Sequence, residues 1–293
     1  MREFFGHCNG LLILLHGGAG IQDPKGESVG TGSTELKEYA VRGFQSLKGG
    51  KAPLDVLTEC LGYMEDSQTF NAGRGAALQA DGQARLTAAV MDGTRQSFSG
   101  VISVSYVTHP SLLARHLQDQ DARVLTSPGA ELLARKLNTP VESQVTNARL
   151  KNWVAKFEAG DRGLFDTVGC VIRTPDGRLY AGTSTGGRGF EFPGRVSDSA
   201  TVAGNYASEF AAISATGTGE EIVDDALSAR IETRCRDGAT LKDAVMRTIV
   251  EAKARQRSYG FIAVSKSGEF AAAHTTPTMT FAVLGDGQIL ASS

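Results

Sequence analysis

Two kinds of apolar pattern alternate along this chain. Short apolar runs between glycines or turn residues predict buried strands, because side chains along a strand alternate between the two faces of a sheet. Apolar residues spaced three and four apart predict helices that bury one face. Strands are predicted at residues 11–15, 76–80, 84–91, 100–107, 167–172, 179–183, 211–215, 261–264, 270–273 and 280–284. Helices are predicted at residues 33–47, from residue 53 to about 64, at 112–117, 130–137 and 147–157, and in two segments between 215 and 261.

Turn and cap residues set the limits of several of these elements. The Thr-Pro-Asp-Gly sequence at residues 174–177 predicts a hairpin between the strands on either side of it. Thr240 is the expected N-cap of the last helix. Residues 20–32 carry Gly, Asp and Ser and predict a loop, and the polar residues 139–166 predict a linker around one helix. Residues 1–10 show neither pattern and are expected to be a loosely held leader.

The order of the elements points to a fold class. Each half of the chain runs from strands through helices to further strands, which predicts an α+β fold with two sheets packed together and helices outside. A length of 293 residues allows one large domain or two ordinary ones. Apolar residues make up 41% of the chain and 35 residues are glycine, so a soluble, turn-rich globular protein with a large core is expected.

Charge and cysteine usage exclude some kinds of partner. A formal net charge of -2 gives no electrostatic reason to expect binding to nucleic acid or to a membrane surface. The longest early apolar run, residues 11–15, is too short for a transmembrane helix or for the core of a signal peptide. Four cysteines show no Cys-x-x-Cys spacing, so reduced thiols in a cytoplasmic protein are expected.

Candidate chemistry gathers in four threonine- or glycine-bearing stretches of the second half. They are residues 166–170 (Asp-Thr-Val-Gly-Cys), 183–187 (Thr-Ser-Thr-Gly-Gly), 194–199 (Gly-Arg-Val-Ser-Asp-Ser) and 215–220 (Ala-Thr-Gly-Thr-Gly-Glu). The chain offers no Ser/His/Asp order, no metal-spaced His or Cys and no intact phosphate loop. A hydroxyl nucleophile without a nearby histidine needs another base. One solution is the α-amino group of the nucleophile itself, released by cutting the chain before it.

In sequence and order these stretches resemble the plant-type L-asparaginases, or isoaspartyl peptidases, of the N-terminal-nucleophile hydrolases. The first half agrees in residues 15–20 (Leu-His-Gly-Gly-Ala-Gly), 70–75 (Phe-Asn-Ala-Gly-Arg-Gly) and 91–93 (Met-Asp-Gly), and the resemblance runs from about residue 11 to the late 280s. It implies a four-layer αββα sandwich, formed by residues 1–293 as a single domain. It also implies cleavage into an α subunit, 1–166, which ends in a linker from about residue 140, and a β subunit, 167–293.

The resemblance assigns the reaction centre. Thr167 would attack the carbonyl of Asp166 to cut the chain, and would then attack the substrate amide. A free α-amino group has a pKa of about 8 and can take the hydroxyl proton near neutral pH. A lone strand threonine is usually just a β-branched strand residue, and here the context reverses that interpretation. The implied supporting residues are Thr185, which polarises the nucleophile, Thr216 and Gly217, which form the oxyanion hole, and Asn71, which borders the nucleophile.

Ordinary structural roles would also explain some of these residues. Thr185 is compatible with a hydrogen-bonded turn residue, and Asn71 with a turn asparagine. Thr216 and Gly217 fit a strand-to-helix turn with a threonine cap. His16 resembles a metal ligand or base in isolation, but it has no partner ligands at suitable spacing, so a packed position near the site is expected.

A substrate clamp follows in the same half. An α-amino acid carries one carboxylate and one ammonium group, so its site needs a cation and an anion. By resemblance, Arg195 would bind the carboxylate, Asp198 the ammonium, and the Gly219 carbonyl the ammonium as well. An Arg/Asp pair three residues apart is more often a surface ion pair. Ser197 replaces a family glycine, and a positive φ there would strain it.

The chain departs from the asparaginase pattern at several positions. Asp166 replaces the usual glycine and resembles the glycosylasparaginases, where a carboxylate would act as a base or through backbone strain, or would be incidental. Arg188, Phe190 and Phe192 replace small, Asn or Lys residues and are expected to reshape the mouth of the site. The start at His16 argues against glycosylasparaginase, whose corresponding segment contains tryptophan.

A sodium-binding loop is also implied by the resemblance. It would wrap a structural sodium ion with backbone carbonyls, although Ser-Gln-Thr at 67–69 replaces the Pro and Cys frequent in relatives. The six carbonyls expected to bind it belong to Met64, Glu65, Ser67, Phe70, Ala72 and Arg74.

The expected activity is hydrolysis of L-asparagine and of β-aspartyl (isoaspartyl) dipeptides through a Thr167 acyl-enzyme, with no cofactor for catalysis. The alternatives are a glycosylasparaginase and a non-catalytic amino-acid-binding homologue. A homodimer of cleaved αβ units is the assembly that the resemblance implies, with no nucleic-acid or membrane partner.

Overall fold

The computed structural model describes residues 3–20, 27–160 and 167–293, and in these ranges the chain forms two stacked sheets. The smaller sheet has the order β1 (Glu3–His7), β11 (Glu269–His274), β10 (Tyr259–Ser265), β9 (Ala211–Gly217) and β8 (Asn205–Ala207). The larger has the order β13 (Gln288–Ser292), β12 (Thr278–Gly285), β2 (Leu12–Gly20), β6 (Val168–Arg173), β7 (Leu179–Thr185), β3 (Leu86–Asp92), β4 (Ser97–Val104) and β5 (Val124–Thr126).

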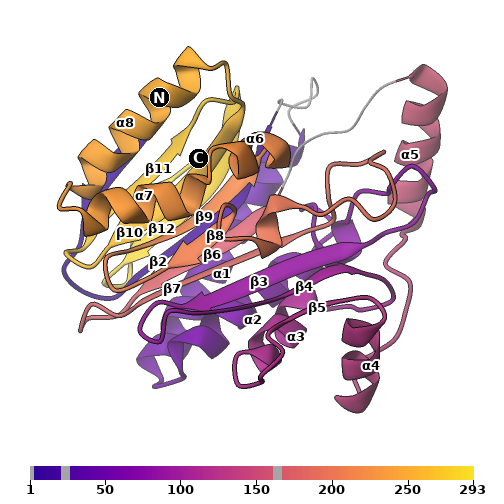
Figure 1. Ribbon diagram of the computed structural model, residues 1–293, viewed down its shortest axis with the longest axis horizontal. Coiled ribbons are helices and arrows are strands. Elements are labelled where there is room, and N and C mark those ends of the chain that lie inside the picture. Colours follow the sequence, from indigo (N-terminus) through magenta and orange to yellow (C-terminus); the bar gives the residue numbers. More distant parts are fainter. Residues whose placement is uncertain (1–2, 21–26, 161–166) are drawn as a thin grey trace.

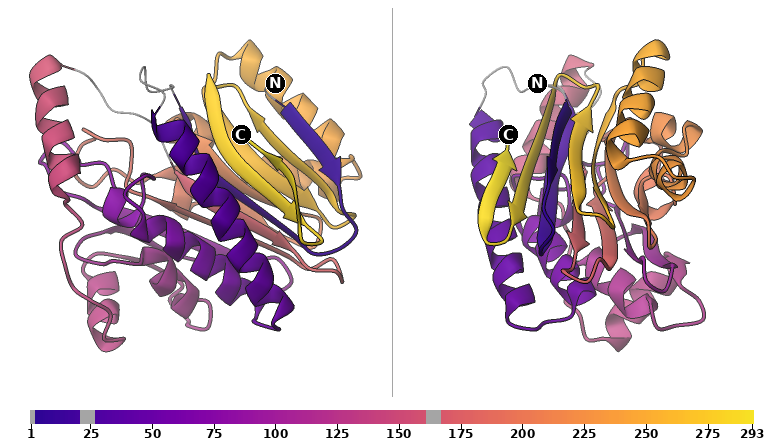
Figure 2. Two further views of the ribbon diagram at one scale, coloured as in Figure 1. Left: turned by 180° about the vertical axis from the view of Figure 1, so that it is seen from behind. Right: turned by 90° about the vertical axis from the view of Figure 1, so that its left-hand side faces the viewer.

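Helices cover the outer face of each sheet (Figure 1). Against the larger sheet lie α1 (Glu27–Lys48), α2 (Pro53–Asp66) and α3 (Pro110–Leu117), and against the smaller lie α7 (Leu227–Arg236) and α8 (Leu241–Ala254). The remaining helical segments are η1 (Gly73–Gly75), α4 (Gly129–Lys136), α5 (Asn147–Ala159), η2 (Asp198–Ala200) and α6 (Gly219–Asp224). The edge-on view in Figure 2 shows the layers as helix, sheet, sheet and helix, which confirms the predicted α+β αββα sandwich.

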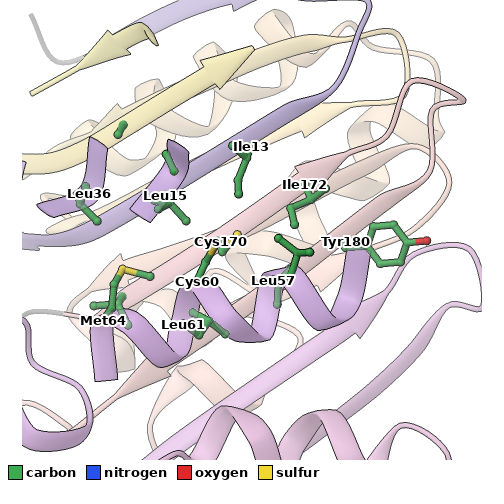
Figure 3. Close-up of a cluster of buried hydrophobic side chains, with 14 of the residues drawn as sticks. Ile13, Leu15, Leu36, Leu57, Cys60, Leu61, Met64, Cys170, Ile172 and Tyr180 are labelled. Carbon is green, nitrogen blue, oxygen red and sulfur yellow. The ribbon is translucent and has the colours of Figure 1, made fainter. Parts of the chain in front are cut away.

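Three apolar layers hold the sandwich together. Between the larger sheet and α2, Leu57, Leu61 and Met64 face Cys170 and Ile172 of β6 (Figure 3). A second apolar cluster fills the space between the sheets, and a third lies between the smaller sheet and α7 and α8. Burial of one such Leu or Met side chain contributes about 1.5–3 kcal/mol, so these layers are the main source of stability.

The space between the sheets changes character along its length. One part is apolar, with Leu14, Val171 and Ile262 in its cluster. Alternate residues of a strand share a face. Two residues after Leu14, Ala181 and Ala212, this face therefore carries the next side chains in line, which are polar and buried: His16 on β2, Thr183 on β7 and Ser214 on β9. The fold therefore places a polar region between two sheets, at one end of the stack.

Several local predictions are confirmed. The hairpin around residues 174–177 joins β6 and β7, which pair antiparallel. Helix α2 begins at Pro53. The Thr240 side chain accepts the Asp243 N–H and caps α8. Helix α5 lies within the predicted linker. These features depend on residues close in sequence, which is why the sequence could specify them.

The interpretation of residues 1–10 as a loose leader is wrong, because residues 3–7 form β1 at the edge of the smaller sheet. Phe4 anchors this strand between the sheets, where its ring lies 6.1 Å from the rings of both Phe270 and Phe281. Phe5 packs on the opposite face, against the apolar cluster under α7 and α8. Two aromatic residues thus hold an edge strand whose sequence showed no clear period.

Other boundaries also differ from the predictions. Residues 76–80 form a loop instead of a strand, since Ala77 N–H donates to the Asn71 side chain and Ala80 N–H to the carbonyl of Glu191. Helix α1 begins at Glu27, so the predicted loop at 20–32 is too long, and residues 21–26 lie outside the described residues. Three helical segments, not two, follow β9, because the helix expected to start at Glu220 is divided into α6 and α7 at Ala226, which has φ 45°.

Candidate active site

The candidate nucleophile lies where the central hairpin of the larger sheet opens. Strand β6 begins at Val168, which pairs with Ser184 of β7, so Thr167 comes to lie beside Thr185. The Thr167 Oγ1 donates a hydrogen bond of 3.1 Å to the Thr185 Oγ1, and both side chains are buried. Two threonines 18 residues apart are therefore joined by the hairpin register.

The loop after β7 supports this pair of hydroxyls. The Gly187 N–H donates to Thr185 Oγ1 over 3.1 Å. The carbonyl of Gly187 accepts from Asn71 Nδ2 over 2.5 Å, and Asn71 Oδ1 accepts the Ala77 N–H over 2.6 Å. Asn71 thus links the first half of the chain to the loop that contacts Thr185. These two hydrogen bonds show that the Asn71 side chain positions the loop next to the candidate nucleophile.

Thr216 and Gly217 end β9 in the opposite sheet. The Thr216 Oγ1 accepts the Ala19 N–H over 3.1 Å, and this bond does not use the Thr216 hydroxyl proton. Gly217 has φ +128°, and a Cβ there would lie 2.5 Å from the Tyr259 Cα. Only glycine fits this position. The cap residue of α6 is Thr218, so the interpretation of Thr216 as a helix cap is wrong.

A buried chain of side chains joins the two sheets beside these residues. His16 Nε2 lies 2.9 Å from Ser214 Oγ, which lies 2.7 Å from Thr183 Oγ1. A Cβ on Gly169 would lie 2.0 Å from Ser214 Oγ, so glycine allows this approach. Burial lowers the pKa of His16 to about 3, and the ring is neutral at physiological pH. His16 therefore aligns the strands, in agreement with the packed position expected from the sequence.

The three residues of the predicted clamp come together around α6. A Cβ on Gly219 would lie 2.6 Å from Arg195 Nη2 and 2.6 Å from Asp198 Oδ1. Arg195 does not pair with Asp198; it donates from Nε and Nη2 to the carboxylate of Glu220, at 2.7 and 3.1 Å. The clamp is thus a cation held by a carboxylate, next to a second carboxylate.

Asp198 is a buried carboxyl group with an unsatisfied oxygen. Its exposed fraction is 4%, and the side chain has no hydrogen-bond partner at Oδ2 within the described residues. Burial raises the pKa of Asp198 to about 7, opposed by Arg195 and assisted by Glu220. A buried polar atom without a partner is costly. The arrangement fits a carboxylate that receives an ammonium group from a ligand.

The pH dependence follows from this pKa. In the cleaved enzyme that the resemblance implies, two protons would have to leave below pH 7, one from Asp198 and one from the α-amino group of Thr167, whose ordinary pKa is about 8. We then expect log kcat/KM for the implied substrate, L-asparagine, to rise with pH with a slope approaching two between pH 5 and about 6.5. A pH–rate profile checks this, and a slope of one would contradict the assignment of a raised pKa to Asp198. Because folding raises this pKa, ionisation of Asp198 lowers the free energy of unfolding as pH rises from 4 to 7.

The residues of the predicted sodium loop lie at the end of α2 and around η1. A Cβ on Gly73 would lie 2.1 Å from the Glu65 carbonyl oxygen, and one on Gly75 would lie 1.9 Å from the Phe70 oxygen and 3.0 Å from that of Ser67. Three of the six predicted carbonyls therefore converge on this glycine turn. The carboxylate of Glu65 is directed elsewhere, where it accepts from Ser111 and Ser184.

The residues that depart from the asparaginase pattern lie in different surroundings in the structure. Ser197 has φ -76°, so the strain considered for it is absent, and its hydroxyl accepts the Ser199 N–H. Phe190 stacks on Trp153, whereas Phe192 is 84% exposed. Arg188 lies 3.6 Å from Glu220. Asp166 lies outside the described residues.

Sequence reasoning missed two connections of the site. Glu220 was interpreted only as part of a helix start, yet it holds Arg195. Its position directly after the Thr-Gly-x-Gly sequence was the available signal. Ser214 joins His16 to Thr183, and no sequence feature marked it, because a serine in a buried strand has no signature of its own.

Two stacked sheets between helical layers, with a buried threonine at the start of a central strand, are the fold of the N-terminal-nucleophile hydrolases. The asparaginase family model matches residues 9–291, so the chain belongs to the asparaginase family. Enzymes of this family catalyse their reaction without a cofactor, as the sequence predicted. Strand β1 lies before the matched residues.

Curated relatives agree with this family over most of the chain. An isoaspartyl peptidase/L-asparaginase of Synechocystis sp. is 37% identical over 282 residues, which cover 91% of this chain and 85% of the relative. A protein of the same name from Nostoc sp. is 38% identical, covering 88% of this chain and 87% of the relative. An isoaspartyl peptidase of Salmonella typhimurium is 35% identical, covering 90% and 91%.

Proposed function

We propose that this chain is a self-cleaving threonine amidohydrolase that converts L-asparagine to L-aspartate and ammonia and hydrolyses β-aspartyl dipeptides. The observation that carries the proposal is the hydrogen bond of Thr167 to Thr185 at the start of a buried strand. This hydroxyl lies in a chain whose relatives are named isoaspartyl peptidase/L-asparaginase. The group formed by the partly buried Arg195 with the buried Asp198 and Gly219 supplies a complementary site for an α-amino acid.

The first reaction is cleavage of the chain itself. Thr167 Oγ1 attacks the carbonyl carbon of Asp166, the peptide C–N bond breaks, and the Thr167 nitrogen takes up a proton to become a free amine. Water then hydrolyses the ester between Asp166 and the Thr167 hydroxyl. The products are residues 1–166 with a new carboxylate and residues 167–293 with Thr167 as the new N-terminus.

The second reaction uses the amine that cleavage released. The Thr167 amine takes the hydroxyl proton, Oγ1 attacks the side-chain amide carbon of the substrate, and ammonia or an amino acid leaves after receiving that proton. Water then attacks the acyl-enzyme and L-aspartate leaves. Thr216 Oγ1 and Gly217 N–H would stabilise the oxyanion, and loss of one such donor typically costs about 3 kcal/mol of transition-state stabilisation.

Binding in this scheme depends on charge. Arg195 would hold the α-carboxylate of the substrate while Glu220 keeps its guanidinium in place. Asp198, through the Oδ1 atom that lies on the side of Gly219, and the Gly219 carbonyl would accept the α-ammonium. Each substrate charge thereby meets an opposite charge or dipole, which offsets the cost of burying it.

Two measurements test the proposal. Purified protein is analysed by intact mass, where fragments 1–166 and 167–293 are expected, and by ammonia release from L-asparagine and aspartate release from β-aspartyl dipeptides. An unbroken chain that binds amino acids without turnover would support the non-catalytic alternative. Faster release of sugar from a glycosylasparagine than of ammonia from asparagine would support the glycosylasparaginase alternative.

We also propose that the loop from Met64 to Arg74 binds a structural sodium ion through main-chain oxygens. The convergence of the Glu65, Ser67 and Phe70 carbonyls on Gly73 and Gly75 supports it. Oxygen ligands suit a hard cation. The melting temperature should be higher in sodium chloride than in potassium chloride at equal ionic strength, and equal values would contradict the site.

Assembly and location remain predictions. We expect a homodimer of cleaved units, which light scattering of the mature protein would measure. A cytoplasmic location is consistent with four cysteines that are all unpaired. Within the described ranges, no helix combines the length and apolarity that a membrane span requires.

A further inference from the structure

A small hollow lies between α5 and the loop that follows β7, at the side of the molecule where α5 projects (Figure 1). Three basic side chains line it, those of Arg149, Lys156 and Arg188, together with the rings of Trp153 and Phe190. The residues that line the hollow include no aspartate or glutamate. A pocket with three cations and two aromatic rings is suited to an anionic ligand with an apolar portion.

The wall of this hollow is built by specific contacts. Trp153 Nε1 donates to the carbonyl of Gln79 over 3.0 Å, which fixes α5 to the first half of the chain. The Trp153 ring stacks on Phe190 with 5.6 Å between centroids and 11° between planes. Phe190 adopts φ +57°, a left-handed conformation that is unfavourable for a residue with a side chain. The stacking and the bond from Phe190 N–H to the Leu78 carbonyl stabilise that conformation.

The hollow adjoins the candidate active site on two sides. Asn71 lines it and donates to Gly187, whose N–H contacts Thr185, the partner of Thr167. Arg188 lies 3.6 Å from Glu220, the same carboxylate that holds Arg195. A substrate held by the clamp would therefore have the hollow beside it.

The charges of the two proposed substrates differ in one group. Asparagine and a β-aspartyl dipeptide share the α-carboxylate and α-ammonium that Arg195 and Asp198 would match. The dipeptide carries one more charge, the carboxylate of the amino acid that is released, and the clamp offers no further cation for it. Asparagine releases ammonia and has no such group.

We propose that the hollow is a leaving-group subsite, which binds the terminal carboxylate and side chain of the amino acid released from β-aspartyl dipeptides. This inference rests on the proposed function. Arg149 and Arg188 are held by protein groups, the Phe70 carbonyl and Glu220 respectively. Lys156, one helical turn from Trp153 and half-buried, is the cation that carries the recognition of the carboxylate.

The test compares two substrates that differ only in the charge of the leaving group. The kcat/KM of β-aspartyl-leucine is divided by that of its C-terminal amide for the wild type and for Lys156→Gln, Lys156→Glu and Lys151→Gln. The wild type should prefer the acid by roughly fivefold, as expected for a partly exposed ion pair. Lys156→Gln should bring the ratio close to one and Lys156→Glu below one. Lys151→Gln, an exposed lysine of the same helix outside the hollow, should keep the wild-type ratio.

The outcomes separate this inference from the proposed function. A wild-type ratio of one, or an unchanged ratio in both Lys156 variants, overturns the subsite while leaving dipeptide hydrolysis intact. Failure of the wild type to hydrolyse either dipeptide overturns the subsite together with the isoaspartyl part of the proposed function. Ammonia release from asparagine, measured in every variant, shows that each protein has folded and matured.

Discussion

Replacing Thr167 with alanine should leave the chain unbroken and the protein inactive. The variant lacks the hydroxyl that attacks the peptide carbonyl before it, so no N-terminal amine forms. It also lacks the nucleophile for the substrate amide. Loss of a nucleophile lowers kcat by roughly 10⁴-fold or more. Denaturing electrophoresis and ammonia release measure the two effects in the same preparation.

The serine variant is the matched control for this experiment. Thr167→Ser keeps a hydroxyl that can reach Thr185 Oγ1 and should keep measurable cleavage and activity, at reduced rates because the stiff β-branched side chain is lost. Thr167→Ala removes a mostly buried side chain, so its melting temperature must be compared with that of the wild type. An alanine variant that releases ammonia at the wild-type rate would overturn the mechanism.

Asp198→Asn should retain cleavage but lose substrate binding. The asparagine side chain has nearly the same shape, and the hydrogen bond between Thr167 and Thr185 does not involve Asp198. It cannot, however, neutralise the ammonium group of a bound substrate. Removing one member of a buried charge pair costs several kcal/mol, so kcat/KM for asparagine should fall roughly 10²- to 10³-fold.

The control for this variant is Asp237→Asn, an exposed aspartate after α7. It changes the net charge equally and should have near wild-type kinetics. Because the pKa of Asp198 is raised to about 7, Asp198→Asn should also flatten the acidic side of the pH profile, so that a slope of one remains from the Thr167 amine. Full activity of Asp198→Asn would show that another group binds the ammonium.

Local sequence was sufficient for the elements that position the nucleophile. The turn at 174–177 specifies the hairpin, and its register brings Thr185 to Thr167. The Thr-Gly sequence at 216–217 ends a strand at a backbone geometry that only glycine adopts. Such features depend on residues that are neighbours in the sequence and on the alternation of apolar and polar side chains along a strand. Both can be read directly from the sequence.

Contacts between distant segments were not predictable in the same way. Strand β1 depends on pairing with β11, more than 260 residues away, and on aromatic contacts across that pair. The partner of Arg195 was unknown until α6 placed Glu220 beside it. The stacking of Trp153 on Phe190 joins the two predicted fragments, and neither residue alone predicts it.

By itself, the sequence determined which side chains are available for the chemistry, in what order, and on which strand ends they lie. The tertiary structure decided their state: that Asp198 is buried with a raised pKa, that His16 is neutral between the sheets, and that Arg195 is already held by a carboxylate. The physical reason is that burial and electrostatic environment are produced by elements that meet only when the two sheets pack. The amino-acid sequence specifies the residue types and their local spacing. It does not specify how strongly each ionisable group is shielded from water in the folded protein.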